Sequence, residues 1–184
     1  MAPLLVSAPL AAAPATYRID PEHCSIAFLV DHMGYEKMIG MFTDVSGEFV
    51  YDEAKQHLAS GHVEIQSASV DTHHRPRDGH LRSGDFLDSE RHPLIRFVAR
   101  EYRPGAADGV LRGDLTLLGQ TRPVELSVRL NRAAKYPFGH GRHTLGISAR
   151  GSIRRSEFGM TYGVANDMVG DEVELLIEFE AWQE

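Results

Sequence analysis

The sequence has few of the features that mark several large classes of protein. Its 184 residues include a single cysteine, Cys24, so no disulfide can form within the chain and cysteine usage does not reveal the redox compartment. The 19 Lys and Arg residues are outnumbered by 26 Asp and Glu residues, and the net charge of −7 disfavours a nucleic-acid surface or general attraction to anionic headgroups. No stretch reaches the roughly 18 apolar residues of a membrane-spanning helix, so we expect no transmembrane segment.

Sequence motifs for catalysis are also missing. No glycine-rich loop follows a strand pattern and opens a helix, as a phosphate-binding loop does. There is no Gly-x-Ser-x-Gly nucleophile motif, and Ser46 and Ser152 lack an obvious His and carboxylate context. We therefore expect no catalytic residues, no cofactor and no enzymatic activity.

The first fifteen residues differ in composition from the rest. The segment MAPLLVSAPLAAAPA is apolar, rich in Ala and Pro, and has no charged side chain. It resembles the apolar core and small-residue end of a secretory signal, with cleavage after Ala13 or Ala15, although the first basic residue is Arg18. We expect 1–15 to be a signal remnant, which indicates a periplasmic or secreted protein. The alternative is a low-complexity tail on a cytoplasmic protein. Residues 16–184 then form one domain of ordinary size.

From Tyr17 onward the dominant period of the sequence is two. Alternation of this kind is typical of strands with one buried face. Turn signals separate the runs, as at 51–53, 104–109, 118–120 and 137–139. We expect an all-β fold, either a sandwich or a barrel. The apolar positions of the eight runs begin at Ile26, Val45, Val63, Ile95, Leu111, Val124, Leu145 and Val173.

One segment, 77–90, breaks the period of two between the third and fourth runs. Leu81 and Phe86 are among its apolar positions at roughly helical spacing, while two glycines weaken a long helix. We expect a short helix or two turns, carrying Leu81 and Phe86 over the barrel opening or against a ligand. Phe158 is expected to do the same from the other side.

The inward positions of the runs indicate what the interior holds. Small residues there, namely Gly47, Gly113, Ala149 and Gly151, favour an empty volume, although strand glycines also permit bends and bulges. An eight-stranded barrel is wide enough to hold one small ligand. The lining is apolar and so predicts an apolar ligand. The side chains expected along this tunnel are Phe28, Val30, Phe42, Phe97, Leu115, Leu126 and Ile147.

Five motifs in order along 17–184 resemble one known family. The stretch 77–88, RDGHLRSGDFLD, is similar to the RDxHLxSxDFFD motif of the YceI-like polyisoprenoid-binding family. The opening YRIDPEHCSIAF, the central GDLT and GQTRPV, and the closing IRRSEFGM and VGDEV also match. Cys24 stands where the family often has Ser, and Leu87 replaces the second Phe of DFFD.

The resemblance implies an eight-stranded antiparallel lipocalin-like barrel with a long apolar tunnel. It implies a bound polyisoprenoid, such as a prenyl pyrophosphate or prenyl quinone, or another long-chain amphiphile, for transport, storage or sequestration. It also implies export, dimers in many members and no catalytic activity. We therefore expect a lipid-binding protein, with a filled barrel that serves only as an interaction module as a further alternative.

Polar residues near the expected strand ends suggest two further sites. His32, with Arg154 or Arg155, is expected at one rim, where the arginines suit an anionic headgroup. The alternatives are a hydrogen-bonded interior histidine and solvated strand-end charges.

His73, His74 and His80, with Asp71 or Asp78, suggest a metal-binding protein or metal-dependent enzyme. Their spacing matches no usual site, so we expect no metal.

Overall fold

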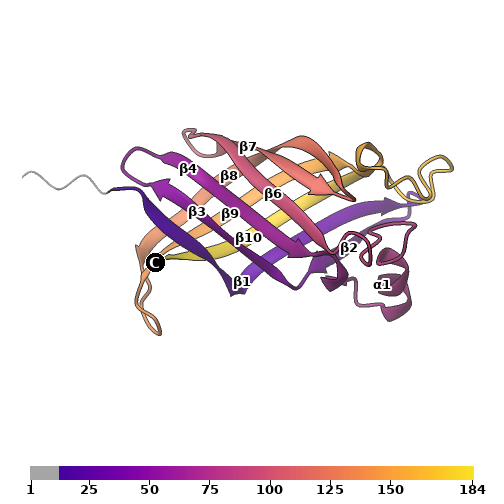
Figure 1. Ribbon diagram of the computed structural model, residues 1–184, viewed down its shortest axis with the longest axis horizontal. Coiled ribbons are helices and arrows are strands. Elements are labelled where there is room, and N and C mark those ends of the chain that lie inside the picture. The colour runs from indigo at the N-terminus through magenta and orange to yellow at the C-terminus, as the bar shows by residue number, and fades with distance from the viewer. Residues whose placement is uncertain (1–12) are drawn as a thin grey trace, which may run out of the picture.

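The computed structural model describes residues 13–184, and their strands follow one another into a closed antiparallel barrel of eight (Figure 1). The first and last strands of the ring pair with each other, so the barrel has no open edge along this seam. The eight strands are β1 (Ala15–His32), β3 (Val45–Asp52), β4 (His57–Gln66), β6 (Leu94–Arg103), β7 (Gly109–Leu117), β8 (Gln120–Lys135), β9 (His143–Arg154) and β10 (Glu172–Gln183).

β1 is the strand that joins the two sides of the barrel. Its first part pairs with β3, its second part pairs with β2 (Glu36–Phe42), and β10 runs along both parts. A register shift between Ile19 and Cys24 separates the two parts. Bulges of this kind bend a strand and increase its local twist, which lets one strand serve two neighbours.

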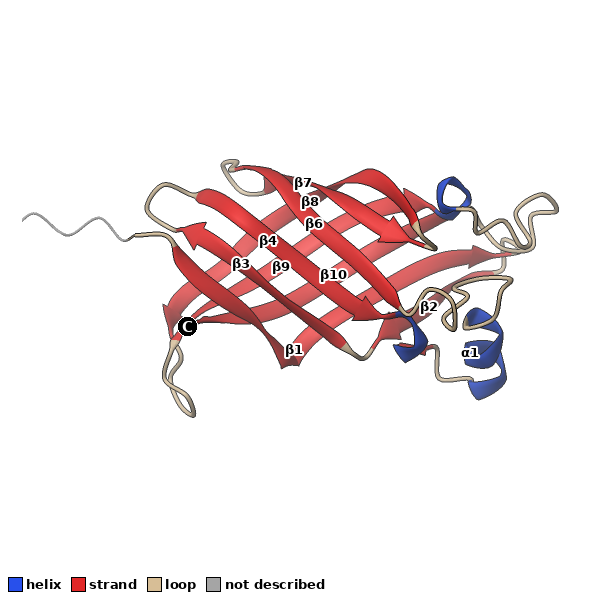
Figure 2. Cartoon of the chain, in the orientation of Figure 1, coloured by secondary structure: helices blue, strands red, loops and turns tan. Residues whose placement is uncertain are grey.

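The remaining elements gather at one end of the barrel (Figures 1 and 2). They are β5 (Val70–Asp71), the helix α1 (Arg75–Leu81), and the short 3₁₀ helices η1 (Ser67–Ser69) and η2 (Arg155–Phe158). We call this the α1 end, where β1 and β9 finish and β10 begins. At the opposite end, which we call the Tyr17 end, β1 begins and β10 finishes.

Each end of the barrel has its own buried core. At the Tyr17 end the core is formed by Tyr17, Tyr51, Leu145 and Ala181. At the α1 end a larger cluster combines strand residues with residues of the covering segments. Its buried members are Ile26, Val45, Ile65, Val70, Phe86, Leu87, Ile95, Leu117, Phe158 and Met160.

The prediction of an eight-stranded antiparallel barrel is confirmed, and all eight predicted runs are strands of the ring. β2 and β5 were not predicted. β2 has apolar residues on both faces, with Met38 half-buried and Ile39 62% exposed, which obscures its alternation. β5 has only two residues.

The short helix lies between the third and fourth strands of the ring, as predicted, but its limits differ. It begins at Arg75 and ends at Leu81, so the expectation that Phe86 lies on the helix is wrong. The helix is capped by His74, whose Nδ1 accepts a hydrogen bond from the Arg77 backbone N–H at 3.3 Å. Phe86 follows in a turn whose backbone hydrogen bonds return to Ser83 and Leu81.

The N-terminal boundary at residue 16 falls one residue inside β1, because Ala15 already pairs with Tyr51. The prediction of a signal segment over 1–15 concerns mainly residues 1–12, which lie outside the described residues. Within residues 13–184, no helix is long and apolar enough to cross a membrane.

Candidate functional site: an apolar cavity in the barrel

The barrel encloses a cavity of about 570 Å³ that follows its long axis. Side chains from every strand of the ring border it, because alternate residues of each strand point inward. The cavity extends from Leu58 and Tyr102, near the Tyr17 end, to His80 and Tyr162 at the α1 end. Its wall is overwhelmingly aliphatic and aromatic, so the interior favours an apolar guest.

Ten of the twelve residues predicted to contact a ligand border this cavity. Nothing in the structure tests their contact with a ligand, but the strand residues among them that were predicted from the period of two do point inward. The ten are Phe28, Val30, His32, Phe42, Leu81, Phe86, Phe97, Leu115, Leu126 and Ile147. Leu81 is the last residue of α1, and Arg77 and His80 of the same helix also border the cavity.

The other two predicted residues, Phe158 and Arg154, do not border the cavity. Phe158 is 1% exposed and belongs to the core of the α1 end. Arg154 is exposed on the outer face, because it has the opposite parity from the inward-facing Ile153. Arg154 does lie at the α1 end of the barrel, because it pairs with Glu172, the first residue of β10. Its side chain, however, points outward and not toward the cavity.

Arg155 borders the cavity but has a structural role. The residue is 2% exposed, and its guanidinium donates to the carbonyl oxygens of Gly170, Met160, Tyr162 and Val169 at 2.7–3.0 Å. These bonds tie the chain after η2 to the barrel. Burial lowers the pKa of Arg155. Since its donors are already engaged with backbone, Arg155 is not available to grip a headgroup.

The inward glycines do not leave empty volume, which corrects the reason given for a cavity. A Cβ on Gly113 would lie 2.2 Å from Cζ of Phe97, and one on Gly40 would lie 2.2 Å from Cζ of Phe28. The ends of these rings therefore occupy the space beside glycines of neighbouring strands. The absence of side chains there lets large aromatic residues fit against the wall. The predicted glycines Gly47, Gly113 and Gly151 are not among the residues that border the cavity.

Polar side chains border the cavity mainly at the α1 end. Asp31, His32, Arg77, His80 and Arg155 lie there, whereas Glu48 and His62 are cross-strand partners in β3 and β4. His80 packs edge-on against the rings of Phe86 and Tyr162, at centroid distances of 5.0 and 5.1 Å. Its Nε2 is 2.9 Å from a carboxylate oxygen of Asp85. This arrangement places one imidazole beside both the apolar wall and an acidic partner.

Arg77 and Asp78 hold the start of the helix through a shared partner, Thr72. Arg77 donates from Nε to the Thr72 hydroxyl at 2.8 Å and from Nη2 to the Thr72 carbonyl at 2.7 Å. Asp78 accepts from the Thr72 backbone N–H at 2.8 Å. Hydrogen bonds from Thr72 hold the pKa of the Asp78 carboxyl below its usual value. Arg77 also borders the cavity, a position that the sequence reading did not assign to it.

At the Tyr17 end one cluster of polar groups bonds internally and stays outside the cavity wall, while Tyr51 and Tyr102 of the same core border the cavity. The Tyr17 hydroxyl donates to Oε1 of Glu53 at 2.5 Å, and Nε2 of His143 lies 2.8 Å from the same oxygen. The Tyr17 ring stacks on Phe49 at 5.4 Å. Burial raises the pKa of Tyr17, and the Glu53 carboxylate raises it further. The result is a polar cluster whose members satisfy each other.

Several cavity residues were missed by the sequence reading. Cys24 borders the cavity, and burial raises the pKa of its thiol to about 11, so the thiol stays protonated at neutral pH. Tyr51 has the predicted inward parity but was not selected. Tyr162 and Met168 lie in the segment between η2 and β10, which has no strand period to follow.

The histidines of the alternative metal hypothesis do not form a site. Among residues 13–184, the groups of three or more metal-ligating side chains close enough to share an ion do not include His73, His74 or His80. Asp71 and Asp78 are engaged with local backbone N–H groups.

The fold and the cavity define a class of protein, an antiparallel β-barrel that encloses an elongated apolar chamber. The YceI-like domain model matches residues 17–181, and the chain belongs to the YceI-like family, as the motifs predicted. Protein YceI of Escherichia coli O17:K52:H18 (strain UMN026 / ExPEC) is 36% identical over 185 residues, covering 100% of this chain and 94% of the relative.

Solved structures show the same fold. BcnA of Burkholderia cenocepacia matches with a TM-score of 0.78 and 22% identity, covering 88% of this chain and 98% of BcnA. A domain from Saccharophagus degradans matches with a TM-score of 0.68 and 12% identity, covering 92% of this chain and 99% of that domain. It is described as a polyisoprenoid binding domain implicated in plant cell wall breakdown.

Proposed function

We propose that the protein binds an amphiphilic lipid, with its apolar chain in the barrel cavity and its polar end at the α1 end. The observation that carries the proposal is the cavity of about 570 Å³ with an almost wholly apolar wall. This volume lies within the range of about 300–1,000 Å³ that is usual for small-molecule sites. The polar groups at one end suit a ligand with one polar terminus.

Burial of the chain alone supplies enough free energy for binding. Removing ~500 Å² of lipid surface from water at ~25 cal/mol per Å² contributes about 12 kcal/mol before costs. Association and ordering of the ligand remove several kcal/mol of this gain. A polyisoprenoid, either a prenyl pyrophosphate or a prenyl quinone, is the ligand class that we place first. The Saccharophagus degradans domain, described as polyisoprenoid-binding, supports this order.

The role that we assign is transport, storage or sequestration without chemistry on the ligand. We further propose a periplasmic or secreted protein and a homodimer. Extracting protein purified from its native host with organic solvent, followed by mass spectrometry, tests the central proposal. A stoichiometric long-chain amphiphile is the expected result. Protein that carries none, and that binds no prenyl compound when offered one, contradicts it.

Arg77 is the cationic residue that we assign to the headgroup, in place of Arg154 and Arg155. Nε and Nη2 of Arg77 bond to Thr72, and no hydrogen bond from Nη1 is found within residues 13–184. His32 and His80 border the same end of the cavity. A charged headgroup is costly to bury in an apolar interior, so this end is the favourable place for it.

Arg77→Gln should weaken binding of a prenyl pyrophosphate by about tenfold or more, since a charged hydrogen bond contributes about 1.5–3 kcal/mol. Binding of a prenyl quinone of the same chain length should change less than about threefold. Arg154→Gln is the matched control, because it removes a charge from the same end outside the cavity. Fluorescence displacement measures the affinities, and thermal unfolding checks that the variants fold. Equal losses for both ligands would show that Arg77 acts only through its bonds to Thr72.

A further inference from the structure

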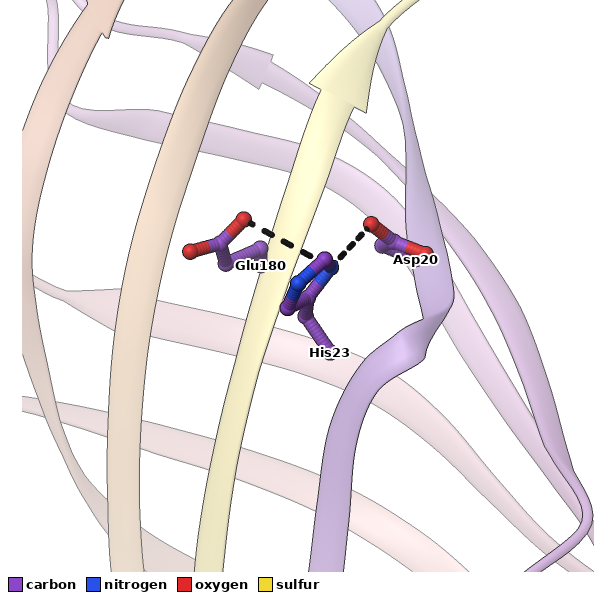
Figure 3. A group of neighbouring side chains, drawn as sticks. All are labelled: Asp20, His23 and Glu180. Atoms are coloured by element: carbon purple, nitrogen blue, oxygen red, sulfur yellow. Dashed lines mark hydrogen bonds and ion pairs between the residues drawn. The ribbon is translucent and has the colours of Figure 1, made fainter. Parts of the chain in front are cut away.

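The bulge in β1 folds three metal-ligating side chains together on the outer wall of the barrel (Figure 3). Ile19 pairs with Ala181 and Cys24 with Phe179, so residues 20–23 of β1 lie opposite the single residue Glu180 of β10. Such a bulge re-aims side chains that regular pairing would alternate between two faces. Asp20, His23 and Glu180 each place one ligand atom within 4.8 Å of the others. None of the three borders the cavity.

The distances between these atoms are close to those of a metal site. Nδ1 of His23 lies 2.7 Å from Oδ2 of Asp20 and 4.0 Å from Oε2 of Glu180. Ligands of a tetrahedral Zn²⁺ with bonds of ~2.1 Å lie about 3.4 Å apart. The two measured distances lie on either side of this value, and the shorter one is a hydrogen bond that an ion bound between His23 and the two carboxylates of Figure 3 would replace.

An unsatisfied atom points to a ligand at this place. Oε2 of Glu180 is itself buried and makes no geometric hydrogen bond within residues 13–184, although the side chain as a whole is 35% exposed and the Tyr136 hydroxyl lies near this carboxylate. The Asp20 side chain is only 9% exposed. Leaving a buried carboxylate oxygen without a partner costs free energy, and a cation would remove that cost.

The local charge also favours a cation. Among the ion pairs of residues 13–184, Asp20 and Glu180 have His23 as their shared partner and no Lys or Arg. Glu22 adds a third negative charge near the imidazole. Two carboxylates and a neutral imidazole carry a charge of −2, which a divalent ion neutralises.

We propose that Asp20, His23 and Glu180 bind a divalent transition-metal ion of the Zn²⁺ type on the outer wall of the barrel. One nitrogen and two carboxylate oxygens suit such an ion, whereas Ca²⁺ and Mg²⁺ prefer oxygen ligands alone. The metal would join β1 to β10 across the seam that closes the barrel. The site is separate from the lipid cavity, so its presence does not depend on the lipid proposal.

Isothermal titration of tag-free protein with Zn²⁺ alone tests the site. The chain has ten histidines, so His57→Gln, which removes an exposed histidine of β4, is the matched control. We expect one equivalent of Zn²⁺ to bind to the wild type and to His57→Gln. His23→Gln and Glu180→Gln should weaken this binding by more than about tenfold, since removal of even an outer partner of a metal ligand costs ~10–100-fold.

Circular dichroism checks that both variants keep the barrel. Glu180→Gln preserves the shape of its side chain, so it remains informative if His23→Gln unfolds. Equal Zn²⁺ binding by the wild type and all three variants would assign the ion to other histidines and overturn the proposal. Absence of stoichiometric binding to the wild type would overturn it as well.

Discussion

The two ends of the barrel each hold a hydrogen-bonded polar cluster, and the clusters differ in whether they border the cavity. At the Tyr17 end, the hydroxyl of Tyr17, the carboxylate of Glu53 and the imidazole of His143 bond to one another, and none of these residues borders the cavity. At the α1 end, Arg77 and His80 form local bonds and also border the cavity. The same alternating strands therefore build one polar cluster that lies outside the cavity and another, at the α1 end, that borders it.

Truncation in the core of the Tyr17 end should give the largest loss of stability. Leu145 is 1% exposed and packs with Tyr17 and Tyr51. We expect Leu145→Ala to lower the free energy of unfolding by about 2–5 kcal/mol, because the surrounding side chains only partly fill the space left. Urea denaturation followed by circular dichroism measures the change. Ile39→Ala, at a side chain 62% exposed, is the control and should change stability by less than about 0.5 kcal/mol. A loss as small for Leu145→Ala as for the control would refute the assignment of this core.

Truncation at the α1 end should affect ligand retention more than stability. Leu81 borders the cavity from the end of α1, and Phe86 borders it from the following turn. We expect Leu81→Ala and Phe86→Ala each to weaken lipid binding by about tenfold, in keeping with the ~1.5–3 kcal/mol of a buried apolar side chain. Quantifying the lipid that co-purifies with each variant measures this effect.

Leu94→Ala is the control for both α1-end variants. Leu94 is 42% exposed at the start of β6 and does not border the cavity. The Leu94→Ala variant should retain as much lipid as the wild type. If both Leu81→Ala and Phe86→Ala are folded and also retain wild-type amounts, the covering segment has no part in holding the ligand.

Alkaline pH should lower the stability of the Tyr17 end through Tyr51, by less than the truncations above. Burial raises the pKa of Tyr51 to about 12, above the value of about 10 expected in the unfolded chain. A raised folded-state pKa contributes stability below pH 10, and this contribution is lost as pH rises from about 10 to about 12. Melting temperatures at pH 8 and pH 11 should fall less for Tyr51→Phe than for the wild type. Equal falls would show that Tyr51 ionisation does not limit alkaline stability.

The period of two in the sequence predicted most of the barrel. The parts that it did not predict depend on tertiary contacts. The period of two located all eight strands of the ring and placed Phe28, Phe97 and Ile147 inside. It did not reveal β2, where Met38 and Ile39 make both faces apolar. Nor did it reveal Tyr162, since the chain after η2 has no regular period and is held by Arg155.

The directions of two arginine side chains show most clearly what the sequence period cannot predict. Arg154 and Arg155 are adjacent in sequence and looked equivalent as headgroup ligands. The strand continues through Arg154, which points outward, while η2 begins at Arg155 and turns its guanidinium toward four backbone carbonyls. One residue of difference at the end of a strand thus decided which charge is buried.

The sequence by itself determined the strands, their inward faces and the apolar character of the interior, because side-chain alternation is a property of each strand alone. Only the tertiary structure decided how the barrel closes, since the seam joins Tyr17 to Gln183 at opposite ends of the chain. It also decided that Phe97 covers Gly113, that Arg77 borders the cavity, and that the β1 bulge faces Glu180. These contacts depend on register between strands, which a one-dimensional pattern does not contain.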